Sequence, residues 1–401
     1  MDTIGENAFH LGGALICVAL AAEATQFIYT GLSNPLSNIP GPWYTRFTAI
    51  PSTYKFMTGH HPDWIHSLHA RYGSIVRYSP SEVDVSDPAA CQRIHSAKAG
   101  YLKTPFYTLL VTDASNVFNE IRPDIHRRFK RLLSHPMSET GLKTFYPRID
   151  NKVRLAIDRM CDENTACGAA DVAKWFMFLS FDVIGDIAFS ESFGNLENGK
   201  FRVFDYAQKA LDRHAKRVEE LGSDPKPTVF SKIYDANEKE MLSRKEMRDN
   251  ALAFIVGGSD TTANSMIYLV WAVCKNPRIK ARLMKELSSL PEDYTYDHLK
   301  ELTYLNCIVN ESLRLYSALP GGLPRLVPPE GAELAGYFVP GRSVVATQAY
   351  SLHRNPDAFP DPYRFNPERW ENTTQLMKDC SMPFGGGARS KAPILPFILV
   401  L

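Results

Sequence analysis

The stretch DNALAFIVGGSDTTANSMIYLVWAVCK, residues 249–275, is apolar at both ends and small or polar only at its middle. As one helix it would be about 40 Å long at 1.5 Å per residue, which is enough to cross a whole domain. An apolar surface on all sides of a helix predicts burial. We therefore expect this helix to be the central element around which the rest of the chain packs.

The middle of the helix reads GGSDTT over residues 257–262. Two glycines inside a helix cost about 2 kcal/mol relative to alanine, so the pair indicates a kink or the close approach of a flat, bulky group. A kinked core helix whose hydroxyls bond back to the preceding turn explains the same residues. A transmembrane span is a third alternative, disfavoured because Asp260 at mid-span would cost about 3 kcal/mol.

The composition is that of a globular chain. Its 401 residues are 44% hydrophobic and 22% charged, enough to bury a large core. The formal net charge of +1 gives no global reason to expect nucleic acid as a partner. Seven cysteines without a CxxC pair predict neither a disulfide framework nor a structural zinc site, and they favour a reducing compartment.

The amino terminus carries one apolar run, residues 8–22, which Glu23 cuts short of the roughly 20 residues that a membrane span needs. Acidic residues stand where a signal peptide has basic ones, so we favour a membrane anchor. Residues 39–43, IPGPW, then predict a stiff, non-helical linker. We interpret residues 1–38 as anchor and hinge, and the remainder of the chain as the body.

Local patterns predict a mainly α body with a small β region. Alternating residues over 74–87 predict a β-hairpin. A basic helix carries His126 and Lys130 four residues apart, where they could hold one anion. An apolar helix over 172–188 carries two aspartates, expected to form its less buried face.

A helix over residues 302–316 carries Glu311 and Arg314, which are neighbours three positions apart. On the surface such a pair would contribute under about 1 kcal/mol. Inside a core helix it implies a buried ionic network that needs further partners. Both alternatives are open at this point.

Four motifs occur in a fixed order: the GGSDTT helix, ESLR at 311–314, NPERW at 366–370 and PFGGGAR at 383–389. Together they resemble the haem-thiolate monooxygenases, the cytochrome P-450 family, and the anchor with its IPGPW hinge is similar to that of microsomal fungal members. The resemblance implies a cytochrome P-450 domain over residues 39–390.

The resemblance also implies roles for single residues. Gly257 and Gly258 would let the haem lie close to the long helix, and Asp260 and Thr261 would deliver protons during oxygen activation. A second set would hold the haem-binding loop or the haem itself. Its members are the locking triad Glu311, Arg314 and Arg369, the propionate partners His126, Lys130, Arg325 and Arg389, the loop residue Phe384, and His353 as a weaker candidate.

The chain departs from the family where the iron ligand belongs. Two residues after Arg389 the family has cysteine, and this chain has Lys391, whose amine does not supply the electron density of a thiolate. Cys380 lies on the wrong side of the loop. Residues 391–401 are an aberrant apolar tail, and the region 194–243 is shorter than the family's two-helix lid. We expect a fold that is incomplete at the carboxyl end and in the lid.

The implied function is a haem b-dependent monooxygenase that hydroxylates or epoxidises a lipophilic small molecule in a fungal specialised-metabolite pathway. It would receive electrons from NADPH-cytochrome reductase at the endoplasmic reticulum membrane, with its body facing the cytoplasm and no nucleic acid partner. The alternative is a catalytically inactive, truncated member that lacks the thiolate ligand, and Lys391 separates these two. A membrane receptor or scaffold with two spans is the third possibility.

Overall fold

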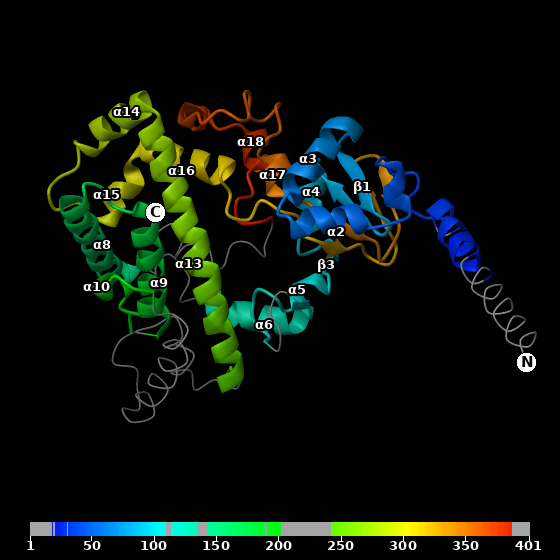
Figure 1. Ribbon diagram of the computed structural model, residues 1–401, viewed down its shortest axis with the longest axis horizontal. Helices are drawn as coiled ribbons and strands as arrows, with labels where there is room; N and C mark the ends of the chain where they lie inside the picture. Colours follow the sequence, from blue (N-terminus) through cyan, green and yellow to red (C-terminus); the bar gives the residue numbers. More distant parts are fainter. Residues whose placement is uncertain are drawn as a thin grey trace, which may run out of the picture. The chain divides into compact units, whose positions relative to one another are not determined.

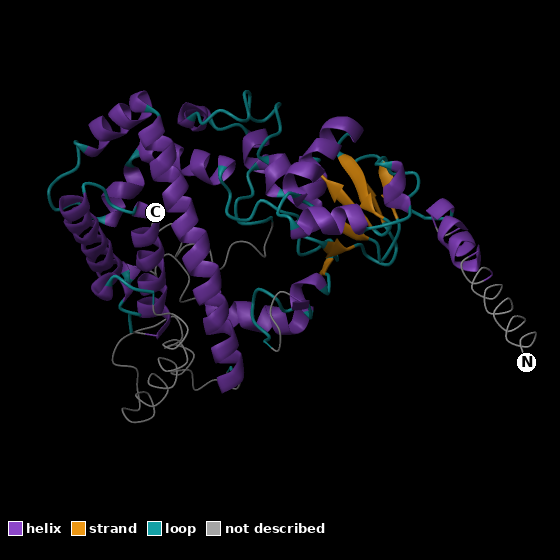
Figure 2. Cartoon of the chain, in the orientation of Figure 1, coloured by secondary structure: helices purple, strands orange, loops and turns teal. Residues whose placement is uncertain are grey.

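The fold consists of two compact units, each assembled from two segments of the chain. The first unit contains residues 1–94 and 321–351, and the second contains residues 95–320 and 352–401. Helices dominate the second unit (Figures 1 and 2). The computed structural model describes residues 18, 21–29, 31–109, 114–134, 141, 143–189, 191–201 and 242–386.

The first unit is built on a small sheet in which the strands follow the order β1-β2-β7-β4. β1 and β2 form the predicted hairpin, β2 and β7 run parallel, and β7 and β4 run antiparallel. The strands are β1 (Ile75–Ser79), β2 (Glu82–Val85), β4 (Arg325–Leu326), β7 (Val344–Ala346) and a separate hairpin of β5 (Ala332–Leu334) and β6 (Tyr337–Val339). The helices are η1 (Trp43–Arg46), α2 (Ile50–Met57), α3 (His61–Tyr72), α4 (Pro88–His95) and α17 (Ala349–Leu352).

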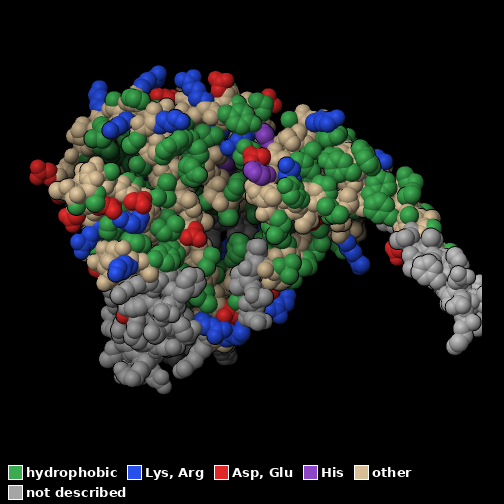
Figure 3. Space-filling view, in the orientation of Figure 1, with side chains coloured by type: hydrophobic (Ala, Val, Ile, Leu, Met, Phe, Trp, Pro, Cys, Tyr) green, Lys and Arg blue, Asp and Glu red, His purple; other side chains and the backbone are tan. Residues whose placement is uncertain are grey.

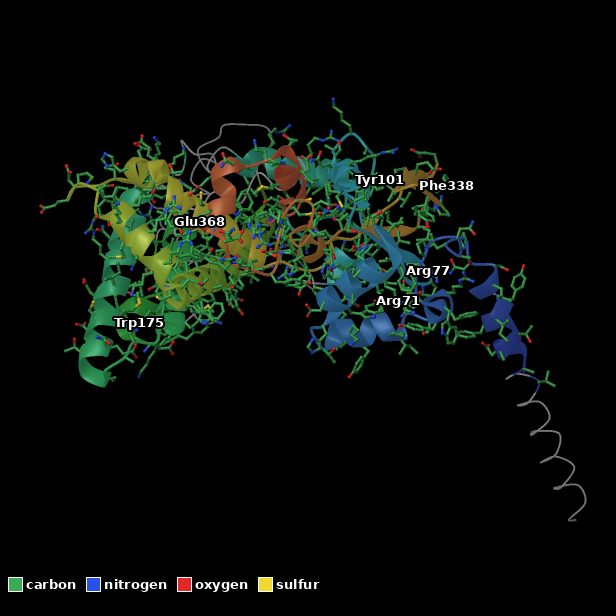
Figure 4. All side chains as sticks on the ribbon, turned by 90° about the horizontal axis from the view of Figure 1, so that it is seen from above. Arg71, Arg77, Tyr101, Trp175, Phe338 and Glu368 are labelled. Carbon is green, nitrogen blue, oxygen red and sulfur yellow. The ribbon has the colours of Figure 1, made fainter. Side chains whose placement is uncertain are left out.

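Arg77 on β1 fastens the IPGPW linker to this sheet (Figure 4). Its guanidinium is buried and donates to the carbonyl oxygens of Ile39 at 2.9 Å and Pro42 at 3.0 Å. Burial lowers the pKa of Arg77 to about 10. The stiff linker predicted from its prolines is therefore held by side-chain hydrogen bonds as well as by backbone restriction.

The second unit is organised around α13 (Arg244–Lys275), as predicted. The helix is continuous through the glycine pair and begins at a capping box formed by Ser243 and Glu246. The other elements are β3 (Leu102–Lys103), α5 (Phe106–Leu109), α6 (Pro123–Ser134), α8 (Tyr146–Cys167), α9 (Val172–Phe189), α10 (Asn195–Asn198), α14 (Pro277–Leu287), α15 (Tyr296–Glu301), α16 (Thr303–Leu315), η2 (Pro367–Asn372) and α18 (Gln375–Cys380).

One face of α13 packs along α9, and together the two helices supply much of the core of this unit (Figure 1). The opposite face carries exposed residues, among them Val256 at 68% exposure and Trp271 at 47%. The prediction of burial on all sides is therefore wrong for one face. An apolar sequence does not distinguish a side chain that packs in the core from one that lines an open face.

The two aspartates of α9 are buried, contrary to the prediction that they form its less buried face. Asp182 accepts the backbone N–H groups of Asn195 at 3.0 Å and Leu196 at 2.9 Å, and Asp186 accepts from Arg148 at 2.6 Å. Because these partners come from α10 and α8, the periodicity of α9 alone could not reveal them. Burial raises the pKa of Asp182.

Three predicted regions lie wholly or largely outside the described residues: the apolar run 8–22, the region 194–243 and the tail 391–401. Within the part of the chain that the structure describes, no helix is both long enough and apolar enough to cross a membrane.

Candidate active site

The open face of α13 carries three of the predicted site residues. A Cβ added to Gly257 would meet no heavy atom of the described residues within 4 Å apart from the backbone of its own helix, and Asp260 is exposed. The Thr261 hydroxyl donates to the Gly257 carbonyl oxygen at 2.6 Å, so it bonds back to the preceding turn in the manner of a core-helix hydroxyl. The arrangement leaves room for a flat group beside Gly257.

Gly258 lies on the other side of the helix. A Cβ added there would come within 3.1 Å of the Ile184 side chain on α9. Its missing side chain thus permits close packing of two helices, and the haem-facing role of Gly258 stays a prediction. Only Gly257 of the pair has open space beside it.

Glu311 on α16 is the fully buried centre of a hydrogen-bonded network. Its two carboxylate oxygens accept from Arg314 at 2.8 Å each, and Oε1 also accepts from Arg369 Nε at 3.1 Å. The structure therefore brings the predicted triad together and excludes the surface-pair alternative. Two further donors were not predicted: the Trp370 indole N–H at 2.9 Å and the Asn366 backbone N–H at 2.9 Å.

Arg314 extends the network into the proline-rich loop. Its guanidinium donates to the carbonyl oxygens of His353 at 2.7 Å and Pro362 at 2.8 Å. One carboxylate thus faces two guanidinium groups, and backbone carbonyls satisfy the remaining donors. The consequence is a loop fixed against α16 by charge-assisted hydrogen bonds.

His353 anchors the segment that leads into the PFGGGAR loop. Its Nδ1 donates to the Arg314 carbonyl at 2.7 Å, because a carbonyl can only accept, and its Nε2 accepts the Met382 N–H at 2.9 Å. Burial lowers the pKa of His353 to about 3. A neutral ring with both nitrogens engaged cannot serve as a cation for a propionate, so that candidate role is wrong, and a positioning role replaces it.

The propionate candidates come from α6, β4 and the PFGGGAR loop. His126 is buried and Lys130 is half-buried, one turn apart on α6, as the spacing predicted. Arg325 is buried on β4 of the first unit, where it donates to the Pro324 carbonyl at 2.9 Å. Arg389 lies outside the described residues, whereas Phe384 is described and half-buried.

The residues meet one of two requirements of a haem site: they leave space for the flat ring, but they do not place a cysteine at the ligand position. The open space beside Gly257 suits a flat group, but the ligand position holds Lys391, which lies beyond the described residues. Cys380 is fully buried in α18, eleven positions before that ligand position. In the described part of the chain no three His, Cys, Asp or Glu side chains cluster as metal ligands. The chain as it stands does not offer the thiolate that its motifs require.

A long central helix, a buried ExxR network and a proline-rich loop locked to it define the fold class of the haem-thiolate monooxygenases. The chain belongs to the cytochrome P450 family, whose model matches residues 40–221 and 202–390. This confirms the resemblance drawn from the four motifs.

Among its relatives, Cytochrome P450 monooxygenase tazI of Aspergillus terreus is 38% identical over 94% of this chain and 86% of the relative. Cytochrome P450 monooxygenase orf2 of Aspergillus niger is 33% identical over 96% of this chain and 88% of the relative. A crystal structure of a cytochrome P450, CYP102L1, shares the fold with a TM-score of 0.74 at 20% identity, covering 84% of this chain and 85% of that one.

Each alignment with these relatives is longer than the number of residues of this chain that it covers. The alignment with the A. niger protein spans 432 positions but covers 96% of 401 residues, which leaves about 47 positions where only the relative has a residue. The two matches to the family model overlap over residues 202–221, which lie inside the region that is predicted to be shortened.

Proposed function

We propose that this protein derives from a monooxygenase that inserts one oxygen atom into a lipophilic small molecule of a fungal specialised-metabolite pathway. The observation that carries the proposal is the family membership, together with two relatives named as cytochrome P450 monooxygenases. The cofactor would be haem b, which supplies dioxygen activation when bound, and the electrons would come from an NADPH-cytochrome reductase.

The chain's own residues support this proposal on the α13 side. Val256 and Leu252 present apolar side chains on the open face, which suits a lipophilic substrate. Asp260 follows Val256 by about one turn and is directly followed by Thr261, so a solvent-exposed carboxyl group stands beside a hydroxyl. Together the two side chains would relay protons from solvent to the ligand site.

A second candidate function rests on Lys391. With an amine at the ligand position, the 401-residue chain would be a catalytically inactive member that keeps the core and the ExxR network. The shortened region between residues 194 and 243 points the same way, because a block of the family's substrate roof would be absent. We favour this candidate for the chain as it stands, and the monooxygenase for a form with cysteine at 391.

We place the protein at the endoplasmic reticulum membrane with its body facing the cytoplasm. Figure 3 shows hydrophobic side chains on the surface of the first unit. In support of this location, its amino-terminal helices expose large apolar side chains. They are Trp43, Ile50, Tyr54, Phe56 and Met57. Exposed apolar patches of this kind mark interaction surfaces, including membrane contacts.

The reduced carbon monoxide difference spectrum separates the two candidates. The unmodified chain should retain substoichiometric haem and show no thiolate-type band. Lys391→Cys alone should restore little, because the sulfur also needs backbone donors around it. Replacing residues 391–401 with the corresponding ligand loop and following helix of the A. terreus relative should restore the band. A strong thiolate band from the unmodified chain would rule out the inactive candidate.

The substrate class is tested in the source fungus. Deleting the gene should cause accumulation of a metabolite that lacks one oxygen atom relative to the product of the parent strain. An unchanged metabolite profile, combined with a haem-free chain, would leave the inactive candidate as the function of this protein.

A further inference from the structure

The loop at residues 114–120 is held in one conformation by its own side chains. Asn116 Oδ1 accepts the backbone N–H groups of Phe118 and Asn119, each at 3.0 Å. The Asn119 side chain makes two further bonds. Its Oδ1 accepts the Asn116 N–H at 2.9 Å, and its Nδ2 donates to the Ala114 carbonyl at 2.7 Å. Both asparagines are buried. The loop is therefore a preformed structural piece.

Two neighbouring side chains of α13 tie this loop to the helix. Asn250 Oδ1 accepts the Val117 N–H at 2.9 Å, and Asp249 Oδ2 accepts the Ser115 N–H at 3.1 Å. Asn250 is fully buried, and its Nδ2 donates to the Glu246 carbonyl at 2.8 Å, which sets the direction of its acceptor oxygen. On the other side of the loop, Lys103 donates to the Phe118 carbonyl. We call this set of bonds the α13 latch.

Helical geometry relates the latch to the candidate active site. Gly257 follows Asn250 by seven residues, which brings it within about 20° of the same direction and about 10 Å further along the axis. Thr261 follows by eleven residues, again within about 20° of that direction and about 16 Å along. The latch thus fixes the loop at one end of the stripe of α13 that carries Gly257 and Thr261. Figure 1 shows α6, which follows this loop, beside the amino-terminal half of α13.

The loop presents one large apolar side chain that its own anchoring does not bury. Phe118 is 45% exposed, although the backbone on both sides of it is bonded to buried groups. Its ring contacts Tyr107 edge-on at a centroid distance of 6.1 Å. An exposed aromatic residue on a loop fixed by a rigid scaffold is the usual construction of a binding residue.

We propose that Asn250, supported by Asp249, is a positioning residue that holds the 114–120 loop at the amino-terminal end of the α13 stripe that carries Gly257, and thereby fixes Phe118 at the edge of the ligand site. The inference rests on the proposed lipophilic ligand but not on bound haem, because every contact that carries it lies within the described residues of the second unit. The buried amide does not touch the ligand; it acts through the loop.

The first test is amide hydrogen exchange on the full 401-residue chain. Asn250→Leu removes the acceptor of the Val117 N–H, so exchange at residues 115–118 should accelerate roughly five- to tenfold, the size expected for one lost neutral hydrogen bond. Exchange in α9 should stay unchanged. Asn264→Leu is the matched control, because the Asn264 amide makes the same bond to the carbonyl four residues earlier, at 2.9 Å, without holding a loop.

A milder pair of variants covers the case in which Asn250→Leu fails to fold. Asp249→Ala removes the acceptor of the Ser115 N–H, whereas Asp249→Asn keeps an acceptor oxygen at the same place. Exchange at residue 115 should accelerate in the first variant and return towards the parent value in the second. Unchanged exchange at 115–118 in both Asn250→Leu and Asp249→Ala would overturn the latch.

The second test measures binding of Nile red, a lipophilic fluorescent probe. Phe118→Ala should lower its affinity about fivefold without changing loop exchange, and Asn250→Leu should lower affinity and accelerate exchange together. Faster exchange with unchanged Nile red affinity would overturn the positioning role, leaving Asn250 purely structural. If the unmodified chain binds no Nile red, the proposed ligand site fails, while the exchange data alone still decide the latch.

Discussion

Each of the two units buries a carboxylate, and the two carboxylates have different kinds of partner. Glu311 in the second unit is surrounded by five donor groups, from Arg314, Arg369, Trp370 and the Asn366 backbone. Asp84 in the first unit accepts from His69 Nε2 at 2.8 Å, and both side chains are almost fully buried. Both sites bury a carboxylate against a nitrogen-bearing side chain.

The difference lies in what the partner can do with its proton. Arginine stays protonated at every pH that a protein meets, so the Glu311 network has one charge state. Histidine changes charge near neutrality. Burial raises the pKa of Asp84, and the hydrogen bond from His69 opposes that rise. The comparison shows that burying a carboxylate lowers the free energy of unfolding unless a partner compensates it, and that the chemistry of the partner decides whether this effect varies with pH.

Glu311→Ala should give the largest effect in this comparison. Removing the carboxylate leaves two buried guanidinium groups without their counter-charge, which costs about 3–5 kcal/mol and should yield largely insoluble protein. Asp150→Ala is the control, since its pair with Arg154 is exposed and should cost under about 0.5 kcal/mol. Soluble yield and the thermal unfolding midpoint measure both. A Glu311→Ala midpoint equal to the parent's would show that the network contributes no stability.

His69→Ala should destabilise the first unit in a pH-dependent way, by about 3 kcal/mol near neutrality, the upper range for a hydrogen bond to a charged group. Without His69 only burial acts on Asp84, so its folded-state pKa lies above the unfolded value. Stability from a raised carboxyl pKa is present at low pH and is lost as pH rises. The variant should therefore fall further below the parent as pH rises above about 4, the ordinary pKa of a carboxyl group.

Thermal unfolding of parent and His69→Ala across that pH range measures the effect, with His69→Gln as the control that keeps a side-chain donor. A constant difference between variant and parent at all pH values would mean that Asp84 does not carry the pH dependence. It would remove the distinction between the two buried carboxylates.

Trp370→Phe tests whether a single neutral donor matters to Glu311. The variant keeps an aromatic ring but removes the indole N–H. It should lower the free energy of unfolding by about 1.5 kcal/mol, because four donors to the carboxylate remain. Trp175→Phe is matched to it, since the Trp175 indole N–H donates to the less buried Glu163 at 2.7 Å (Figure 4 labels Trp175). A larger loss from Trp175→Phe in urea unfolding would contradict the assignment.

Asp84→Asn should have the smallest effect and sharpens the comparison most. His69 Nδ1 donates to the Gly73 carbonyl at 2.8 Å, so a neutral ring offers an acceptor at Nε2, to which the introduced amide can donate. The expected change is under about 1 kcal/mol. Glu311→Gln should be severe, because its amide N–H groups would face at least two donors, Arg314 Nε and the Trp370 indole N–H if they replace Oε2. Similar melting curves for the two amide variants would break the contrast.

Much of the architecture was predictable because it depends on local order in the sequence. A long apolar run predicted α13, the helical spacing of apolar residues predicted α16, and the hairpin over 74–87 followed from alternation. The triad of Glu311, Arg314 and Arg369 was reachable only through the resemblance, since spacing alone left a surface pair open.

The contacts that escaped prediction depend on partners distant in the chain. Neither Gly258 against Ile184 nor Asn250 on the Val117 N–H has a local signal, because each contact joins segments about 75 to 130 residues apart. His353 is similar: its sequence suggested a cation, and only the Met382 N–H on its second nitrogen shows a neutral ring. Long-range hydrogen bonds are the part of a site that periodicity cannot reveal.

The sheet of the first unit has a consequence for how the protein is made. β7 pairs with β2 on one side and β4 on the other, and Val83 meets Val345, a separation of 262 residues. While the ribosome synthesises the whole helical unit in between, the β1–β2 hairpin has no neighbour along one edge and keeps apolar residues such as Val83 uncovered. The hairpin can therefore complete its sheet only after Ala346 has been synthesised, so its pairing is slow to form and its open edge is exposed to aggregation until then.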